Sequence, residues 1–318
     1  MRHAKLLLVT LFATQSLIAG VAHAGVIDLA TQMGGANIYT LHDFSAPSSD
    51  VEGALVSGGS VNVSAYSIND KNADAFGARG YAVVARNNLT LSGGSINNGK
   101  AYVGGTMALQ NAASPERAGS SPIDFDATSA YYKALALNLS KVGATGSITD
   151  LWGGSVVNGG GSGLIDVFNV STDTFRTSHT WNTTGLTAGQ TLIFNIDGQN
   201  GTFNHGGVSF EPLSAFNVLF NFYEATDVDV RGVIGSILAP NALMHAQSGV
   251  INGNVIVDSW SSSVQVNANH YFKSVELAGF TAPGTVDTTD SGNPVPEPAG
   301  VALALAALGM MGLVRRRR

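Results

Sequence analysis

Apolar and polar residues alternate along three stretches of the chain, at residues 52–68, 81–109 and 227–260. Within each stretch, short alternating runs are bounded by Gly and Asn. A period of two is typical of strands that bury one face, and the bounding residues are those that tight turns use. The pattern therefore predicts a mainly β domain built from many short strands.

The short strands also resemble one another loosely. Residues 57–61 (SGGSV) resemble residues 92–96 (SGGSI), and residues 96–105 resemble residues 251–259. Irregular self-similarity favours a β-solenoid of the right-handed β-helix kind, in which each turn stacks its inward side chains on the next. No exact period is present, and a β-sandwich, which also has many short strands, is the alternative.

Residues 126–143 follow a helical period instead. Tyr131, Leu135 and Leu139 fall on one stripe, which predicts an amphipathic helix of about three or four turns packed beside the β domain. The residues that we expect to cap its N-terminus are Asp126, Thr128 and Ser129.

The N-terminus has the three parts of a secretory signal peptide. Two basic residues precede the apolar run 6–21, and an A-x-A site formed by Ala22 and Ala24 follows. This order predicts that signal peptidase removes residues 1–24 and leaves Gly25 as the first residue of the mature chain.

The C-terminus has three parts of its own. Before these parts, residues 281–295 are rich in Pro, Gly, Thr, Ser and Asp, which predicts a flexible linker between the β domain and the C-terminus. As a helix, the apolar run 299–314 would reach ~24 Å, against a bilayer core of ~30 Å, with its basic end on the cytoplasmic side. The flanking parts are Pro296, Glu297 and Pro298 before the run, and Arg315, Arg316, Arg317 and Arg318 after it.

This three-part order resembles a PEP-CTERM sorting signal, at residues 296–318. The resemblance implies processing at or near the motif by a membrane protease of the exosortase type. It also implies a Gram-negative bacterium that makes exopolysaccharide. With the signal peptide, it implies transient insertion in the inner membrane through residues 299–314. The protein would then reach the outer surface or the extracellular matrix.

The central region, residues 25–280, carries a second resemblance. Across residues 41–276, and most clearly in Asp50-Val51-Glu52-Gly53 and in residues 235–242 (GSILAPNA), the chain is similar to the choice-of-anchor A domain. That resemblance implies a surface-displayed extracellular module without established catalytic residues. We expect Asp50 to cap a turn that leads into the first strand, with a Ca²⁺ or sugar contact as the alternative.

The charge of the central region narrows the range of partners. Residues 25–293 hold 10 Lys and Arg against 21 Asp and Glu, a net charge of −11. A domain this acidic is unsuited to nucleic acid, because it cannot neutralise a row of phosphates, and anionic lipid would repel it. The chain has no cysteine, so it uses neither disulfides nor thiolate ligands.

No motif of catalytic chemistry is complete in the sequence. It contains no G-x-S-x-G elbow and no G-K-[ST] phosphate loop. The five histidines after the signal peptide have no metal-ligand spacing. The sequence therefore predicts no catalytic residue, no cofactor and no zinc or iron site.

One acidic group is a candidate for calcium. Asp227 and Asp229 share one face of a predicted strand, and Glu224 is close to them in sequence. Their carboxylates could bind Ca²⁺ or serve as the acid pair of a glycosidase. We favour a solvated strand face, opposite Val228 and Val230.

Three functions follow from these observations. We expect a non-enzymatic, exported surface or matrix protein that associates with exopolysaccharide in adhesion or biofilm. A polysaccharide-active lyase or glycosidase on a solenoid is the alternative. Ice binding would need repeated Thr-x-Thr ladders, and only residues 172–174 have that spacing. Aromatic residues available to stack on a sugar are Trp152, Trp181, Trp260, Tyr66, Tyr81, Tyr102 and Tyr271.

Overall fold

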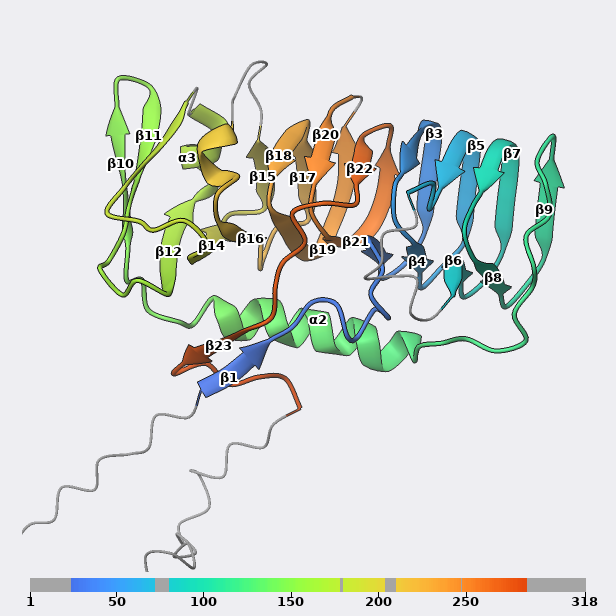
Figure 1. The fold of residues 1–318 in the computed structure, drawn as a ribbon, viewed down its shortest axis with the longest axis horizontal. Coiled ribbons are helices and arrows are strands. Elements are labelled where there is room, and N and C mark those ends of the chain that lie inside the picture. The colour runs from blue at the N-terminus through green and yellow to red at the C-terminus, as the bar shows by residue number, and fades with distance from the viewer. Residues whose placement is uncertain (1–23, 72–79, 178–179, 204–209, 247, 285–318) are drawn as a thin grey trace, which may run out of the picture. The chain divides into compact units, whose positions relative to one another are not determined.

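The structure is a computed structural model that describes residues 24–71, 80–177, 180–203, 210–246 and 248–284 (Figure 1). The chain divides into two units, residues 1–283 and residues 284–318. The predicted sorting signal, its apolar run 299–314 and most of the signal peptide lie outside the described residues. Within the described part of the chain, no helix is both long enough and apolar enough to cross a membrane.

The first unit is mainly β, as the alternating pattern predicts. The first half of its elements comprises β1 (Ala24–Ile27), β2 (Ile38–Thr40), β3 (Phe44–Val51), β4 (Leu55–Ser57), β5 (Val61–Ile68), β6 (Tyr81–Ala85), β7 (Leu89–Ile96), β8 (Lys100–Val103), β9 (Met107–Gln110), α2 (Phe125–Leu139), β10 (Ser147–Leu151) and β11 (Gly154–Asn158). The second half comprises β12 (Ile165–Ser171), α3 (Thr172–Thr177), β13 (Trp181–Thr184), β14 (Thr191–Asp197), β15 (Asn200–Phe203), the 3₁₀ turn η1 (Glu211–Leu213), β16 (Asn217–Asn221), β17 (Asp227–Val230), β18 (Gly232–Ile234), β19 (Ser236–Ala246), β20 (Val250–Asn252), β21 (Val255–Ser262), β22 (Gln265–Asn267) and β23 (Val275–Ala278).

Most strands join one 18-stranded sheet, and the pairings within it are parallel. The pairings form three ladders. The helix-side ladder contains β12, β14, β16, the first half of β19, the first half of β21, β2, β4, β6 and β8. The open ladder contains β15, β17, the second halves of β19 and β21, the first half of β3, β5, β7 and β9. The third ladder contains β18, β20, β22 and the ends of β3, β5 and β7.

Helix α2 lies along the helix-side ladder, and this position explains the composition of those strands (Figure 1). Residues of β14 such as Ile193 face the helix, whereas their neighbours Leu192 and Phe194 face the interior. Strands buried on both faces read as continuous apolar runs, here TLIFNI in β14 and VLF in β16. The strands of the open ladder alternate instead, because only one of their faces is buried.

A row of asparagines attaches the C-terminal half of α2 to the ladder. Asn221 donates to the carbonyl of Ala136 (2.9 Å), and Asn195 donates to the carbonyl of Leu139 (2.8 Å). Asn169 continues the row towards Val142, and the three amides are also bonded to one another. The last carbonyls of a helix lack an N–H partner within it. The asparagine amides donate hydrogen bonds to carbonyls at and just beyond the end of α2.

The predicted helix is present, but two of its details differ. Its N-cap is Asp124, whose carboxylate accepts from the N–H groups of residues 126 and 127, so the predicted caps at Asp126, Thr128 and Ser129 are wrong. Asp124 accepts because it precedes the first helical turn, whereas the other three lie inside the helix. Tyr132, rather than Tyr131, is the fully buried tyrosine of the apolar stripe.

The interior between the ladders is filled by stacked aromatic side chains. Phe168, Phe194 and Phe220 hold matching positions on β12, β14 and β16, with ring centroids 4.9 and 5.2 Å apart. Trp260 stacks on Phe44 in the same way at the contact of β21 with β3. In-register strands place like residues over one another, which favours such stacks.

The glycine pairs mark close approaches of the backbone, but not equivalent ones. A Cβ at Gly58 would lie 2.2 Å from the carbonyl oxygen of Leu41, at the corner between β4 and β5. Gly94 has a φ of +102° at a bend inside β7. The similar stretches 57–61 and 92–96 therefore hold different places in the fold. The similar stretches 96–105 and 251–259, by contrast, hold like places, because both run from the third ladder into the helix-side ladder.

Candidate functional site

From β21 to β9, the outward side of the open ladder is a surface of uncharged side chains. On β5, for example, Val61 and Val63 are buried while Asn62 and Ser64 are exposed. The same alternation runs from β21 across β3, β5 and β7 to β9. We call this surface the polar face, and its residues are Ser259, Ser261, Ser45, Pro47, Asn62, Ser64, Thr90, Ser92, Ala108 and Gln110.

The residues of the polar face repeat in register. Ser261, Ser45, Asn62 and Thr90 stand opposite one another on successive strands. Neighbouring strands lie about 4.8 Å apart, and alternate residues of one strand lie about 6.6 Å apart. The face is thus a regular array of hydroxyl and amide groups, suited to many weak contacts with an extended, uncharged partner.

The three carboxylates named as weak calcium candidates lie towards the other end of the open ladder. Asp227 and Asp229 share the outer side of β17, as predicted. Asp227 is 2.7 Å from Nε2 of His245, and Glu224 accepts the backbone N–H of Gly198 (2.7 Å). Asp229 is 3.7 Å from Arg231.

In the described part of the chain, no three His, Asp or Glu residues gather closely enough to hold a metal ion. Calcium binding at Glu224, Asp227 and Asp229, the alternative to a solvated strand face, stays a prediction. Asp227 and Asp229 lie beside His245 and Arg231, and Glu224 accepts a backbone N–H.

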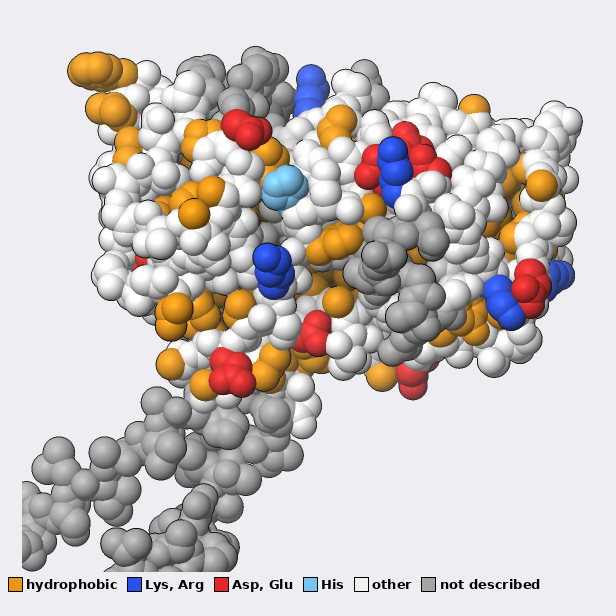
Figure 2. Space-filling view, viewed as in Figure 1, with side chains coloured by type: hydrophobic (Ala, Val, Ile, Leu, Met, Phe, Trp, Pro, Cys, Tyr) orange, Lys and Arg blue, Asp and Glu red, His pale blue; other side chains and the backbone are white. Residues whose placement is uncertain are grey.

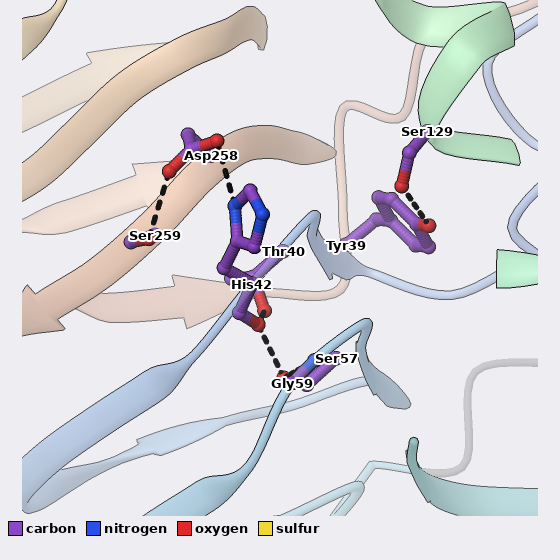
Figure 3. Close-up of polar contacts among 8 residues, drawn as sticks. All are labelled: Tyr39, Thr40, His42, Ser57, Gly59, Ser129, Asp258 and Ser259. Carbon is purple, nitrogen blue, oxygen red and sulfur yellow. Dashed lines mark hydrogen bonds and ion pairs between the residues drawn. The ribbon is translucent and has the colours of Figure 1, made fainter. Parts of the chain in front are cut away.

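A second His–Asp pair lies at the corner between the helix-side and open ladders (Figure 3). Nδ1 of His42 is 2.8 Å from Asp258, and the hydroxyl of Ser259 donates to the same carboxylate. The hydroxyl of Ser57 donates to the backbone carbonyl of His42 (2.7 Å). A nucleophilic serine would have to contact the histidine ring, whereas Ser259 contacts the aspartate. The cluster therefore fastens the corner and lacks the geometry of a catalytic triad.

Asp50 lies within β3, so the predicted cap of a turn before the first strand is wrong. Aspartate is common in turns, but here strand β3 continues through Asp50 to Val51, because β3 pairs with β5 from Phe44 to Val51. Burial, followed by the nearby carboxylates of Asp70 and Glu52, raises the pKa of Asp50 above its usual value. Glu52 itself accepts the backbone N–H of Ala268 (2.9 Å).

The aromatic candidates for sugar stacking separate sharply by exposure. Trp152 is 97% exposed, beside Leu151, which is 52% exposed. These two residues lie at the free end of the β10–β11 hairpin, where apolar side chains gather in Figure 2. Three of the others are buried in the core, namely Trp181, Trp260 and Tyr66, and three are partly buried, namely Tyr81, Tyr102 and Tyr271.

Sequence reasoning missed the polar face and the His42 corner for different reasons. The face has a sequence signal, because Ser, Asn and Thr occupy the outward positions of VNVS in β5 and LTLS in β7. The corner has none, since His42 and Asp258 are 216 residues apart in the chain.

Comparison with protein families matches residues 30–268 to the family described as "Putative Ice-binding-like adhesive domain". The chain belongs to this family. A second match covers residues 294–318 and is the PEP-CTERM protein-sorting motif. No curated protein and no solved structure matches the chain.

The two matches fit together on one chain. The ice-binding-like adhesive domain contains all three ladders and the polar face, and the sorting motif follows it. The PEP-CTERM motif implies export to the cell surface of a Gram-negative bacterium and processing by machinery of the exosortase type. The two matches thus indicate an exported surface protein with an adhesive-like domain.

The adhesive-domain family and the choice-of-anchor A resemblance cover nearly the same residues, and the latter name stays a prediction. Residues 172–174, the one Thr-x-Thr in the sequence, lie in helix α3 rather than on a strand. The polar face of this family member carries one threonine, Thr90, among serines and asparagine.

Proposed function

We propose that this protein is a non-enzymatic adhesin of the cell surface or extracellular matrix, which holds an extended exopolysaccharide through its polar face. The family match to an adhesive domain carries this proposal. The polar face supports it, because none of its ten positions carries a charge, although residues 25–293 have a net charge of −11. Adhesion of this kind adds many weak hydrogen bonds over a large area instead of relying on one deep site.

The same proposal includes the architecture. The chain contributes strands to the three parallel ladders in rotation. This order supports a solenoid in which each ladder forms one flat side. In a β-sandwich, by contrast, antiparallel pairing would predominate. Among the described strands, antiparallel pairs occur only in β1–β23 and β10–β11. A solenoid suits adhesion because it presents a long, regular side to a polymer.

A polysaccharide lyase or glycosidase is the second candidate function. It would need two carboxylates converging on one groove, 5–10 Å apart in round numbers. Asp227 and Asp229 share a face, but Asp227 is bonded to His245 and Glu224 to the backbone. Release of reducing ends or unsaturated sugars from host exopolysaccharide by the purified protein would favour this candidate over the adhesin.

Export can be tested by the mass and location of the mature protein in its native host. We expect a chain that begins at Gly25, ends near Pro298 and is found in the outer envelope or medium. In this structure Gly25 lies in β1, paired with Leu277, so cleavage after Ala24 would remove the first residue of this strand and leave residues 25–27 to pair with β23. A protein that retains Arg318 in the inner membrane would contradict the sorting part of the proposal.

Adhesion can be tested by adding charge to the polar face. Asn62→Lys with Thr90→Lys places two cations on neighbouring strands, and Ala127→Lys with Ala130→Lys places two on the exposed side of α2 as the matched control. We expect a host that carries the first pair to lose attachment and retain little protein in its matrix, and the control pair to behave as wild type. Equal attachment by both would exclude the polar face as the adhesive surface.

A further inference from the structure

A pocket of about 510 Å³ lies apart from the polar face. Its wall is formed by the segment after β22 and by the loop that enters β16. No residue of the polar face lines it. A volume of this size is in the range of small-molecule sites, which run from about 300 to 1,000 Å³. The residues that the following argument uses are Phe216, Asn217, His270, Tyr271, Phe272 and Lys273.

The ionisable side chains around this pocket that can carry positive charge are His270 and Lys273. Both are exposed at its rim. Lys273 forms no ion pair with any described carboxylate, whereas Lys71, Lys100, Arg86 and Arg176 each have one. The lining includes no Asp or Glu. Residues 25–293 have a net charge of −11, so an unpaired cation beside a pocket without acidic lining is a local site for an anion.

The segment that carries Lys273 is held in place by side chains of the sheet. Asn217 at the start of β16 accepts from the N–H of Lys273 (2.8 Å) and donates to its carbonyl (3.0 Å). Asn254 and Ser236 accept the N–H of Phe272, at 3.2 and 3.1 Å. A segment without regular secondary structure is thereby fixed before any ligand arrives, which reduces the entropy lost on binding.

Two features of residues 270–273 favour a role in ligand binding. His270 has a φ of +49°, a left-handed conformation that is costly for a residue with a side chain and that occurs preferentially at functional sites. Phe216 and Tyr271 are partly buried and line the pocket, and Phe272 is a buried residue of its lining. Apolar rings beside a cation match a sugar ring that has a C–H face and carries a negative group.

We propose that this pocket binds a uronate, a pyranose unit with a carboxylate, as part of an acidic polysaccharide. The sugar's C–H face would rest on the rings of Phe216 and Tyr271, and the carboxylate would face Lys273 and His270. The inference goes beyond the proposed function, since it assigns a second, acidic polymer to this pocket. It uses a surface separate from the polar face, so the two can fail independently.

The test is calorimetric titration of the full chain purified from its native host with short oligogalacturonate. The matched ligand is the same oligomer with its carboxyls methyl-esterified, which keeps the rings and removes the charge. We expect binding of the acid and at least about tenfold weaker binding of the ester, equivalent to ~1.4 kcal/mol. Equal binding of both, or no binding of the acid, would overturn the proposal.

Variants identify the pocket as the place of binding. Lys273→Gln should weaken oligogalacturonate binding about tenfold or more, whereas Lys133→Gln, which removes an exposed charge from α2, should leave it unchanged. Lys273→Arg should retain most of the affinity. If Lys273→Gln and Lys133→Gln lost the same affinity for oligogalacturonate, the oligomer would be responding to the net charge of the protein, and the pocket would not be its binding site. The Asn62→Lys and Thr90→Lys pair should bind oligogalacturonate normally even where surface adhesion is lost.

Discussion

Trp152 holds a backbone conformation that its side chain makes costly. Together with Gly153 it forms the two-residue loop of the β10–β11 hairpin, and φ is +53° at Trp152 and +83° at Gly153. Loops of this kind with both φ values positive favour Asn-Gly, because Asn tolerates the left-handed region and bulky residues do not. A tryptophan that is strained and 97% exposed contributes nothing to the core, and we predict that it contacts a partner outside the domain.

Trp152→Asn should therefore stabilise the hairpin while it weakens adhesion. We expect a gain of about 1 kcal/mol in local stability from the relieved backbone. Amide hydrogen exchange of residues 147–158 would measure this gain, and the attachment assay would measure adhesion. Reduced protection in the variant would contradict the strain, and wild-type attachment would mean that Trp152 takes no part in adhesion.

Asp50 predicts a pH dependence of stability with a definite sign. Because its pKa is raised in the folded state by burial and by Asp70 and Glu52, the folded protein holds this proton more tightly than the unfolded chain does. Protonated Asp50 contributes to the free energy of unfolding, and this contribution is present in full below pH 3.8, the ordinary pKa of the residue in the unfolded chain. It is lost as pH rises through the folded pKa, so ionised Asp50 destabilises the fold at neutral pH.

Asp50→Asn should accordingly raise the melting temperature at pH 7 and have little effect near pH 3. We expect a rise of at most about 2–4 °C, since half-exposed charges are screened and ~1 kcal/mol shifts a domain of this size by that much. Thermal melts across this pH range would measure it. Asp150→Asn, at an exposed hairpin position, is the matched control and should give no pH-dependent difference.

At the scale of elements, the contact of α2 with the helix-side ladder depends on buried amides as well as on apolar packing. Asn195 makes three side-chain hydrogen bonds, to Leu139, Asn169 and Asn221. It is 2% exposed, whereas Asn169 at the end of the row is exposed. Removal of a buried member leaves carbonyl and amide groups without partners, and the exposed member can be replaced by water.

Asn195→Ala should lower the free energy of unfolding by about 2–3 kcal/mol, and Asn169→Ala by less than about 1 kcal/mol. Urea denaturation of the two variants beside wild type would measure the difference. Similar small losses in both would mean that the row is solvated, and that apolar contacts such as Tyr132 and Leu135 hold the helix alone.

The strands of the open ladder could be predicted from sequence, and those of the helix-side ladder less well. Alternation in VNVS and LTLS identifies a strand with one wet face, and the structure confirms it at β5 and β7. In TLIFNI both faces are buried, one by the interior and one by α2, so the run carries no period that identifies its two sides. The helix itself was predictable because its apolar stripe repeats over several turns.

The order of the strands across the whole molecule could not be predicted. Strand β2 near the N-terminus pairs with β21 near the end of the domain, and the chain proceeds outward to β9 before α2 brings it back along the ladder (Figure 1). Ile38 pairs with Val255, more than 200 residues away. No local sequence signal specifies this pairing, because it depends on which strand edges remain unpaired once the other strands are in place. The pocket beside Lys273 was missed for the same reason, since its walls come from distant segments.

The charge of the molecule as a whole predicts how its two surfaces respond to salt. The polar face has no charged group to be screened, so attachment to an uncharged polymer through it should change little between 0.01 and 0.5 M NaCl in round numbers. Uronate binding at Lys273 should weaken over the same range, because a local ion contact is screened. Binding of the full chain to neutral and acidic polymer beads at increasing salt would separate the two. A steep loss on neutral beads that Lys273→Gln does not alter would place the adhesive contact on other charged groups, and the polar face would then be the wrong surface.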